Sequence, residues 1–288
     1  SLRTIQWLAF TGVGEANLII PAGVTTIDHG AFTQSNLASI TFEGNDLPTS
    51  FFDANQLTLL KTCVINVTDL QAYISVTDDK HGVMDKNETI LYNYCLEGPM
   101  DWAANIPDTV TTISDKWMDH GSITSITFPP QVVNFGDQPF NLSRLSEIII
   151  QAPLTEFPTE LFYATYLLLH YDFPSQITST GTSLFGFSGL RSVTLPAGLL
   201  EIGYAAFSNS DLISVTVPST VTSIGSSAFN IADLQTVIML PTTPPTAGTN
   251  IFRLTGSLVT IYVPTGTLSA YQNATNWSQY AAYMEEAI

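Results

Sequence analysis

The sequence contains few positive charges. Only 8 of its 288 residues are Lys or Arg, against 25 Asp and Glu, which gives a formal net charge of −17 at pH 7. Binding to nucleic acid or to an anionic membrane needs a patch of basic side chains, and so few cations along the chain cannot form one. The composition therefore argues against both kinds of partner. Disorder is excluded as well, because 45% of the residues are hydrophobic.

Cysteines are scarce, and long apolar runs and a leader segment are missing. Cys63 and Cys95 are too few for a disulfide framework. A pair of buried thiols is the favoured interpretation, and a single bridge stays open if the protein is exported. No apolar run approaches the roughly 18 residues that cross a bilayer, so we expect no membrane span. Ser1 begins ordinary sequence, so any signal peptide is expected to have been removed or never to have existed.

What the sequence does contain is an internal repeat, whose copies mostly follow one another after 22 or 23 residues. The clearest copies read EANLIIPAGVTTIDHGAF at 15–32, LRSVTLPAGLLEIGYAAF at 190–207 and LISVTVPSTVTSIGSSAF at 212–229. Their proline position recurs at Pro21, Pro107, Pro129, Pro174, Pro196, Pro218 and Pro264. An aromatic position further along each copy holds Phe32, Phe140, Phe162, Phe185, Phe207 and Phe229.

A unit of this length cannot bury its own apolar face, so successive units must stack into a solenoid. The segment L-x-x-V-x-L is expected to be a short strand with alternate side chains inward, ended by a proline that cannot donate to a β-ladder. A Gly or Ala lets the chain turn close to its neighbour, and the Phe fills the gap between coils. The repeat thus predicts a mostly β solenoid of about ten coils with a parallel sheet on one face.

The pattern resembles the leucine-rich repeats of the BspA type, found in bacterial surface proteins. The residues that carry the resemblance include IPDTVTTI at 106–113 and VPSTVTSIG at 217–225. The segment GVMDKNETILY at 82–92 is similar to a hairpin that this family inserts between coils. The resemblance implies a right-handed leucine-rich-repeat superhelix in an exported bacterial protein, located outside the cell or at its surface and engaged in adhesion.

The repeat also indicates how the chain is organised. Residues 1–264 are expected to form one solenoid, interrupted by an irregular hairpin insert at 64–100 where the repeat does not scan. In residues 265–288, apolar and aromatic side chains recur at helix-like spacing, and Thr265 or Thr267 can cap the first turn. An end coil exposes an apolar face and an unpaired strand edge, so we expect this segment to form a helical cap.

No arrangement of residues typical of an enzyme occurs in the sequence. The four histidines lie far apart, and none belongs to an H-x-x-x-H motif. The motifs G-x-S-x-G and G-x-G-x-x-G and the Walker loop, which mark nucleophile and nucleotide sites, do not occur. We therefore expect no catalytic residues, no metal site and no cofactor.

Alternation along the predicted strands places small hydroxyls on the outer face of the sheet. The residues two and four before the proline position point outward, and Ser192, Thr194, Ser214 and Thr216 are examples. Thr favours strands, so this ladder has a structural explanation, and a flat uncharged docking surface is the alternative.

Two successive coils interrupt the hydroxyl ladder with ionisable groups. Glu147 stands on one coil, and His170 and Asp172 on the next, so we expect the three to be neighbours. The plainer interpretation is a hydrogen-bonded ion pair on an exposed sheet, which contributes about 0–1 kcal/mol. Contact with a ligand or a cation is the alternative.

The insert offers a second candidate surface, because inserts in repeat proteins vary without disturbing the stack and often carry binding. Its candidate residues are Asp78, Asp79, Asp85, Tyr92 and Tyr94. A solvated hairpin that merely bridges two coils explains the same residues without a ligand.

These observations predict a non-catalytic, monomeric scaffold that binds an extracellular protein, such as a host matrix protein or a protein on another cell. A structural spacer for other domains and a carbohydrate-binding module are the alternatives. Binding or cleaving a glycan would require paired carboxylates over an aromatic floor. Only the insert or the surroundings of Trp102 and Trp117 can supply these.

Overall fold

The computed structural model describes residues 2–14, 16–28, 31–32, 35, 37–43, 64–67, 74–76, 82–85, 90–94, 108–115, 117, 124–231, 233–252 and 260–287. In the short segments between 64 and 94 only the backbone is described. Contacts divide the chain into two compact units, Ser1–Ala152 and Pro153–Ile288.

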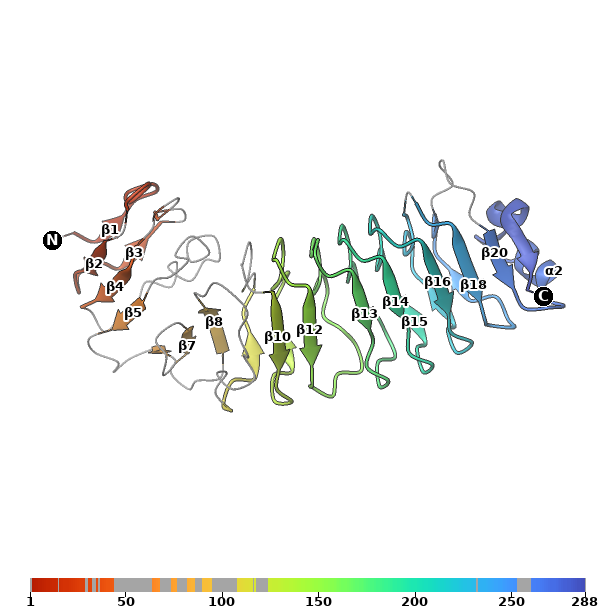
Figure 1. Ribbon diagram of the computed structural model, residues 1–288, viewed down its shortest axis with the longest axis horizontal. Coiled ribbons are helices and arrows are strands. Elements are labelled where there is room, and N and C mark those ends of the chain that lie inside the picture. Colours follow the sequence, from red (N-terminus) through yellow and green to blue (C-terminus); the bar gives the residue numbers. More distant parts are fainter. Residues whose placement is uncertain are drawn as a thin grey trace. The chain divides into compact units, whose positions relative to one another are not determined.

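The second unit is a stack of coils, each of which contributes a strand to a parallel sheet (Figure 1). On one face of the stack β13 (His170–Asp172) pairs with β14 (Ser192–Thr194), and β16 (Ser214–Val217), β18 (Thr236–Met239) and β20 (Thr260–Val263) pair in that order. The two groups of strands lie side by side (Figure 1) and are together called the sheet of the second unit below. Pairing joins His170 to Ser192 and Ser214 to Thr236, so the repeat length sets the register. A second row of shorter parallel strands comprises β15 (Glu201–Ile202), β17 (Ser223–Ile224) and β19 (Thr246–Ala247). This is the stacked solenoid that the periodicity predicts, and its parallel strands agree with the leucine-rich-repeat fold that the resemblance implies.

The first unit repeats the parallel construction. Parallel pairs join β1 (Thr4–Ile5) to β3 (Thr26–Ile27), β2 (Asn17–Ile20) to β4 (Ser39–Phe42), β4 to β5 (Val64–Val67), and β10 (Ser125–Phe128) to β12 (Glu147–Ile150). Val64–Val67, which the sequence analysis places in the irregular insert, is therefore a regular strand in register with β4.

An antiparallel hairpin in the first unit confirms the hairpin expected at 82–92. Its strands β7 (Gly82–Asp85) and β8 (Ile90–Tyr94) follow β6 (Ile74–Val76), and all three pair antiparallel in order. The outer side of β8 then pairs parallel with β9 (Thr112–Ile113), which pairs with β11 (Asn134–Phe135). The hairpin thus belongs to one five-stranded sheet with β9 and β11.

The proline position ends the strands as expected. β16 stops at Val217, immediately before Pro218. The carbonyl of Pro218 then accepts a hydrogen bond from the N–H of Val221 at 3.1 Å, and the carbonyl of Pro196 accepts one from Leu199 at 3.0 Å. Each proline therefore starts the tight turn that leads from the sheet toward the second row of strands.

The phenylalanine position forms a continuous buried column in the second unit. The column consists of Phe162, Phe185, Phe207, Phe229 and Phe252, whose successive ring centroids are 4.9, 5.7, 5.3 and 5.8 Å apart. A buried hydroxyl three residues later donates back to the phenylalanine carbonyl, as Ser188 does to Phe185 and Ser210 to Phe207, each at 2.9 Å. This hydroxyl position was not identified in the sequence analysis.

A glycine column allows the coils to approach each other at the end of the second row of strands. A Cβ on Gly203 would collide with the carbonyl oxygen of Gly181 in the preceding coil. The same substitution at Gly225 would bring the Cβ to 2.5 Å from the backbone nitrogen of Tyr204. The close approach of two backbones therefore requires glycine, which has no Cβ, at this position.

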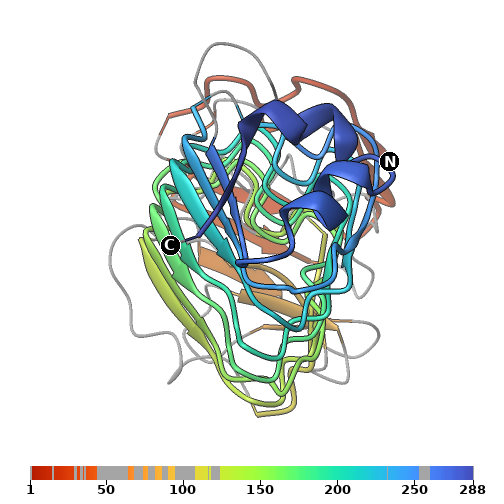
Figure 2. The same cartoon turned by 90° about the vertical axis from the view of Figure 1, so that its right-hand side faces the viewer.

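Helical segments cover the last coil, as expected. In Figure 2 the dark blue helical ribbon lies across the near end of the coils of the second unit. It contains α2 (Leu268–Asn273) and the 3-10 helix η3 (Ser278–Tyr283). Three buried aromatic side chains also bind free backbone groups of the end coil. Tyr271 Oη donates to Pro241 O and Trp277 Nε1 to Pro245 O, each at 2.7 Å, and Tyr280 Oη accepts from the N–H of Phe252 at 3.2 Å.

Two details of the cap differ from the expectation. Thr267 stands at the N-cap position of α2, but its hydroxyl donates to Pro264 O at 2.6 Å and caps no helical N–H. The segment also returns to the sheet, because β21 (Met284–Glu286) pairs parallel with β20. Strand pairing competes successfully with helix there because β20 offers an unpaired edge, and Glu285 and Glu286 add charge to the new edge.

The column predicts that truncating one ring destabilises the second unit strongly. Phe207→Ala should lower the free energy of unfolding by about 3–5 kcal/mol, because the cavity lies between two rings. Phe187→Ala is the matched control, since Phe187 is 49% exposed, and it should cost about 1 kcal/mol or less. Equal losses in urea denaturation would contradict the structural role of the column.

The glycine column gives a second stability prediction. Gly203→Ala should cost about 1–3 kcal/mol, since two backbones must separate to admit the methyl group. Gly198→Ala, whose Cβ would meet nothing nearer than Ser175 O at 3.8 Å, should leave the protein as stable or slightly more stable. Thermal unfolding of the two variants side by side measures the difference, and no difference would refute the close contact.

Candidate functional site

The outer face of the sheet in the second unit carries the candidate site. Along β13, β14 and β16 exposed residues alternate with buried or half-buried ones, as predicted. The exposed members are His170, Asp172, Ser192, Thr194, Ser214 and Thr216. Strand alternation therefore gives a face of small hydroxyls with one ionisable pair at β13.

The ionisable pair is linked into a chain of hydrogen bonds across two strands. His170 Nε2 lies 3.1 Å from Asp172 Oδ1, and His170 Nδ1 lies 2.7 Å from Ser192 Oγ. A carboxylate only accepts, so we assign the Nε2 proton to the bond with Asp172. In the neutral imidazole, Nδ1 then accepts the hydroxyl proton of Ser192. The parallel register explains the geometry, because His170 and Ser192 are direct partners in it.

Asp172 is held in its charged form by its neighbours. A hydrogen bond from Thr194, and then one from His170, keeps the pKa of the Asp172 carboxyl below its ordinary value. Donors to a carboxylate favour its ionised form. Desolvation acts in the opposite direction but is the smaller cause, because the Asp172 side chain is 70% exposed. The site therefore presents a persistent negative charge to solvent.

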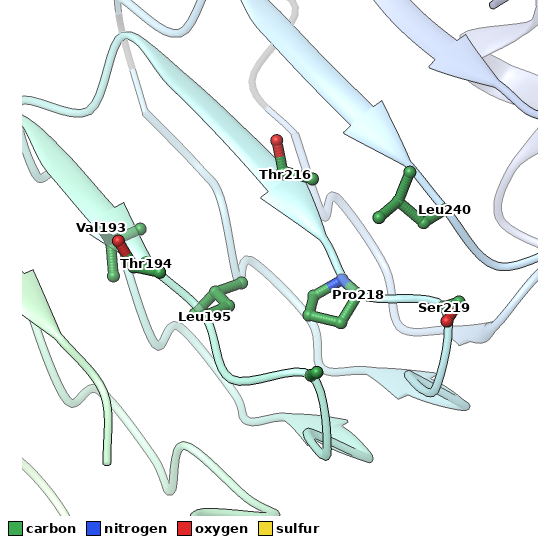
Figure 3. Close-up of a pocket in the computed structure, with 8 residues that line it drawn as sticks. Val193, Thr194, Leu195, Thr216, Pro218, Ser219 and Leu240 are labelled. Carbon is green, nitrogen blue, oxygen red and sulfur yellow. The ribbon is translucent and has the colours of Figure 1, made fainter. Parts of the chain in front are cut away.

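A shallow pocket adjoins this charge at the carboxyl ends of the neighbouring strands (Figure 3). It has a volume of about 410 Å³ and is lined by Val193, Thr194, Leu195, Ala197, Thr216, Pro218, Ser219 and Leu240. Thr194 belongs to both features, since it lines the pocket and donates to Asp172. The arrangement combines an apolar recess, several hydroxyls and one carboxylate.

A chain of hydrogen bonds from a hydroxyl through an imidazole to a carboxylate also occurs in serine hydrolases. Such enzymes add backbone N–H donors that stabilise the developing oxyanion. Here the N–H of Ser192 donates to Leu169 O at 3.2 Å. The imidazole and carboxylate also stand 53% and 70% exposed, where water weakens their interaction. The arrangement favours recognition over catalysis.

The structure brings together only part of the predicted cluster. His170 and Asp172 are in contact. Glu147 is exposed in β12, opposite Ser125, and belongs to the first unit, whereas His170 belongs to the second. The expected proximity of Glu147 to His170 therefore stays a prediction.

For the insert, the structure describes the backbone of three candidates. Asp85 ends β7 opposite Ile74, and β8 contains Tyr92 and Tyr94. Asp78 and Asp79 lie outside the described residues, as do Cys63, Cys95 and Trp102. A shared role for these residues stays a prediction.

Trp117 cannot provide an aromatic floor for a sugar. It is 1% exposed and packs edge-on against Phe128 and Phe140, with ring centroids 5.6 and 6.1 Å away. The Trp117 ring therefore cannot form this floor, because it fills the core of the first unit, and the same expectation for Trp102 stays a prediction.

The pocket was missed in the sequence analysis, although one signal pointed to it. The proline of its third coil, Pro241, fits the repeat only if one residue is inserted, and the extra residue places Leu240 on the surface, 46% exposed. An aromatic pair of half-buried Tyr163 and exposed Phe187 was missed as well. The ring centroids of Tyr163 and Phe187 are 5.6 Å apart. Each residue lies in a turn, and Phe187 has a φ of 56°.

The described residues contain no grouping that suggests a metal site or a membrane span. In that part of the chain no three His, Cys, Asp or Glu side chains are grouped so that they could hold a metal ion. Nor does any helix described there have the length and apolar character needed to cross a membrane.

Comparison with known proteins yields one family match. A model described as the BspA type leucine-rich repeat region matches in 6 copies, at residues 1–74, 89–213 and 168–280. No curated protein matches the sequence.

Solved structures with a similar fold are leucine-rich repeat proteins. One from Bacteroides ovatus has a TM-score of 0.53 and 16% identity, over 92% of this chain and 61% of that one. One from Eubacterium ventriosum has a TM-score of 0.53 and 19% identity, over 76% of this chain and 65% of that one. This chain thus spans less than two thirds of either structure, and at such identity the likeness concerns the fold alone.

The hydrogen bonds to Asp172 predict how its titration responds to mutation. Thr194→Val should raise the Asp172 pKa toward its ordinary value, because the Thr194 hydroxyl is the larger cause of the lowering. Since the folded-state pKa is lowered, these bonds stabilise the fold above the ordinary pKa and the contribution is lost as pH falls through the lowered value. Carboxyl-carbon NMR titration measures the shift, with Thr216→Val as control. An unchanged pKa in Thr194→Val would refute the assigned bond.

Proposed function

Since the chain belongs to the family of BspA-type leucine-rich repeat proteins, we propose that it is a non-catalytic scaffold that binds a protein partner. The proposed contact surface is the outer face of the second-unit sheet, with the pocket beside it. The family supports the further proposal that the protein is exported and acts at the cell surface or outside the cell. The resemblance noted for its repeats, to bacterial surface proteins engaged in adhesion, points the same way.

The observation that carries the proposal is a rigid, exposed and nearly uncharged face with a recess. The backbone of this face is fixed by strand pairing, and its side chains are short, so little conformational freedom is lost when a partner covers them. Hydroxyls lose less hydration free energy than charges do when they are buried. A partner can therefore cover the face at low cost and gain from the apolar pocket.

The other functions considered receive less support from the same residues. A spacer needs no distinctive surface, whereas this face combines a pocket with a structured ionisable cluster. A glycan site needs an aromatic floor, and Trp117 is buried. A hydrolase needs oxyanion donors, and the N–H of Ser192 is already bonded to Leu169.

A large charged side chain in the middle of the face should weaken binding strongly. Thr216→Arg projects a guanidinium over the pocket wall, so affinity for a bound protein should fall at least tenfold, or about 1.4 kcal/mol. Biolayer interferometry against a panel of matrix proteins, mucins and bacterial surface proteins measures this.

The matched control is Thr222→Arg, which places the same charge at an exposed threonine beside the second row of strands. It should leave binding unchanged. Equal losses in both variants, or no binding to any panel member by the folded protein, would argue against the proposal.

A further inference from the structure

We infer that the pocket and Asp172 form one subsite for a basic segment of the partner protein. An aliphatic side chain of that segment would enter the pocket, and a neighbouring Lys or Arg would bind the Asp172 carboxylate. The inference rests on the proposed function and specifies the chemistry of the partner.

The pocket wall selects an apolar side chain. Val193, Leu195, Pro218 and Leu240 are apolar members of its lining (Figure 3). Leu240 is 46% exposed although it is a large aliphatic residue. Covering it with another apolar group removes both surfaces from water, which is the main favourable contribution to protein association.

The Asp172 carboxylate selects a cation. A carboxylate has about four acceptor positions, and the hydrogen bonds from Thr194 and His170 use two of them. The remaining positions are free to accept the N–H groups of an ammonium or a guanidinium. No residue that lines the pocket is charged, and Arg191 precedes β14, at the opposite end of that strand from the pocket. The net charge of −17 favours a basic partner further, because it speeds the encounter.

The register fixes the spacing between the two contacts. Asp172 is paired with Thr194, and the pocket extends from Thr194 across the coil of Thr216 to Leu240. Asp172 and Thr194 stand on paired strands, which are about 4.8 Å apart, and the coil of Thr216 is one further step along the stack, so Asp172 lies about 10 Å from the middle of the pocket. An extended segment that crosses the strands covers this distance in about three residues. The apolar and basic residues of the partner should therefore be two or three positions apart.

The test is selection of short linear peptides from a random phage library on the immobilised full chain. Enriched peptides should carry an aliphatic residue two or three positions from a Lys or Arg, and their binding should weaken as salt rises. Asp172→Asn should lower their affinity about tenfold and abolish the preference for the basic residue. Asp211→Asn, which removes an exposed carboxylate elsewhere, should change neither.

A third variant separates this inference from the proposed function. Two results would overturn the basic subsite while the docking face stands. In the first, the peptides do not bind Thr216→Arg but carry no basic residue. In the second, they do not bind Thr216→Arg but bind Asp172→Asn as well as they bind the unmodified chain. Peptides that are wholly apolar or purely polar would give the first result. If none is enriched, or if they bind Thr216→Arg equally well, both proposals fail. Circular dichroism checks that each variant is folded.

Discussion

The stacking of one phenylalanine ring on the next is the constraint on which the second unit depends. Phe185, Phe207 and Phe229 lie almost parallel, with interplanar angles of 9° and 2°, so each coil must place its ring directly over the previous one. Parallel strands 22 residues apart in sequence are one consequence, as in the pairing of Ser214 with Thr236. The missing Cβ at Gly203 is another, because the coils cannot stack at this spacing with a methyl group between them.

The same constraint determines what the outer face can do. Inward positions are committed to the core, so variation is confined to short side chains that stand on an immobile backbone. A cluster such as His170, Ser192 and Asp172 forms because the register places the first two opposite each other and alternation places the third on the same face. Repetition thus supplies a prearranged surface, and a single irregular coil, that of Leu240, supplies the recess.

The fold was largely predictable from sequence because the length of the sequence repeat is also the separation between paired residues on neighbouring strands. The strands, the prolines that end them and the phenylalanine column follow from slots in the repeat, and the hairpin at 82–92 follows from the resemblance to the family. Other features do not. Ser183, Ala205 and Ser227, two residues before each stacked ring, adopt φ values of 49°, 51° and 58°. This left-handed conformation costs residues other than glycine about 1–2 kcal/mol. Local propensity therefore opposes it, and the stacking of the coils imposes it. The strand β21 was likewise hidden, because its partner edge on β20 exists only in three dimensions.

The candidate site was predictable only in part, and the reason is physical. Alternation placed His170 and Asp172 on the outer face, but a hydrogen bond depends on which hydroxyl stands on the next coil, and Ser192 looked like any other member of the ladder. The hydrogen bonds that Thr194 and His170 donate to Asp172 keep this carboxylate ionised in water. On a face otherwise composed of hydroxyls, one fixed charge influences a partner more than the same charge among many. Once a partner excludes water from the pocket, that charge acts through a lower effective dielectric. The scarcity of charge in the sequence therefore makes the position of each remaining carboxylate on the docking face informative about what binds there.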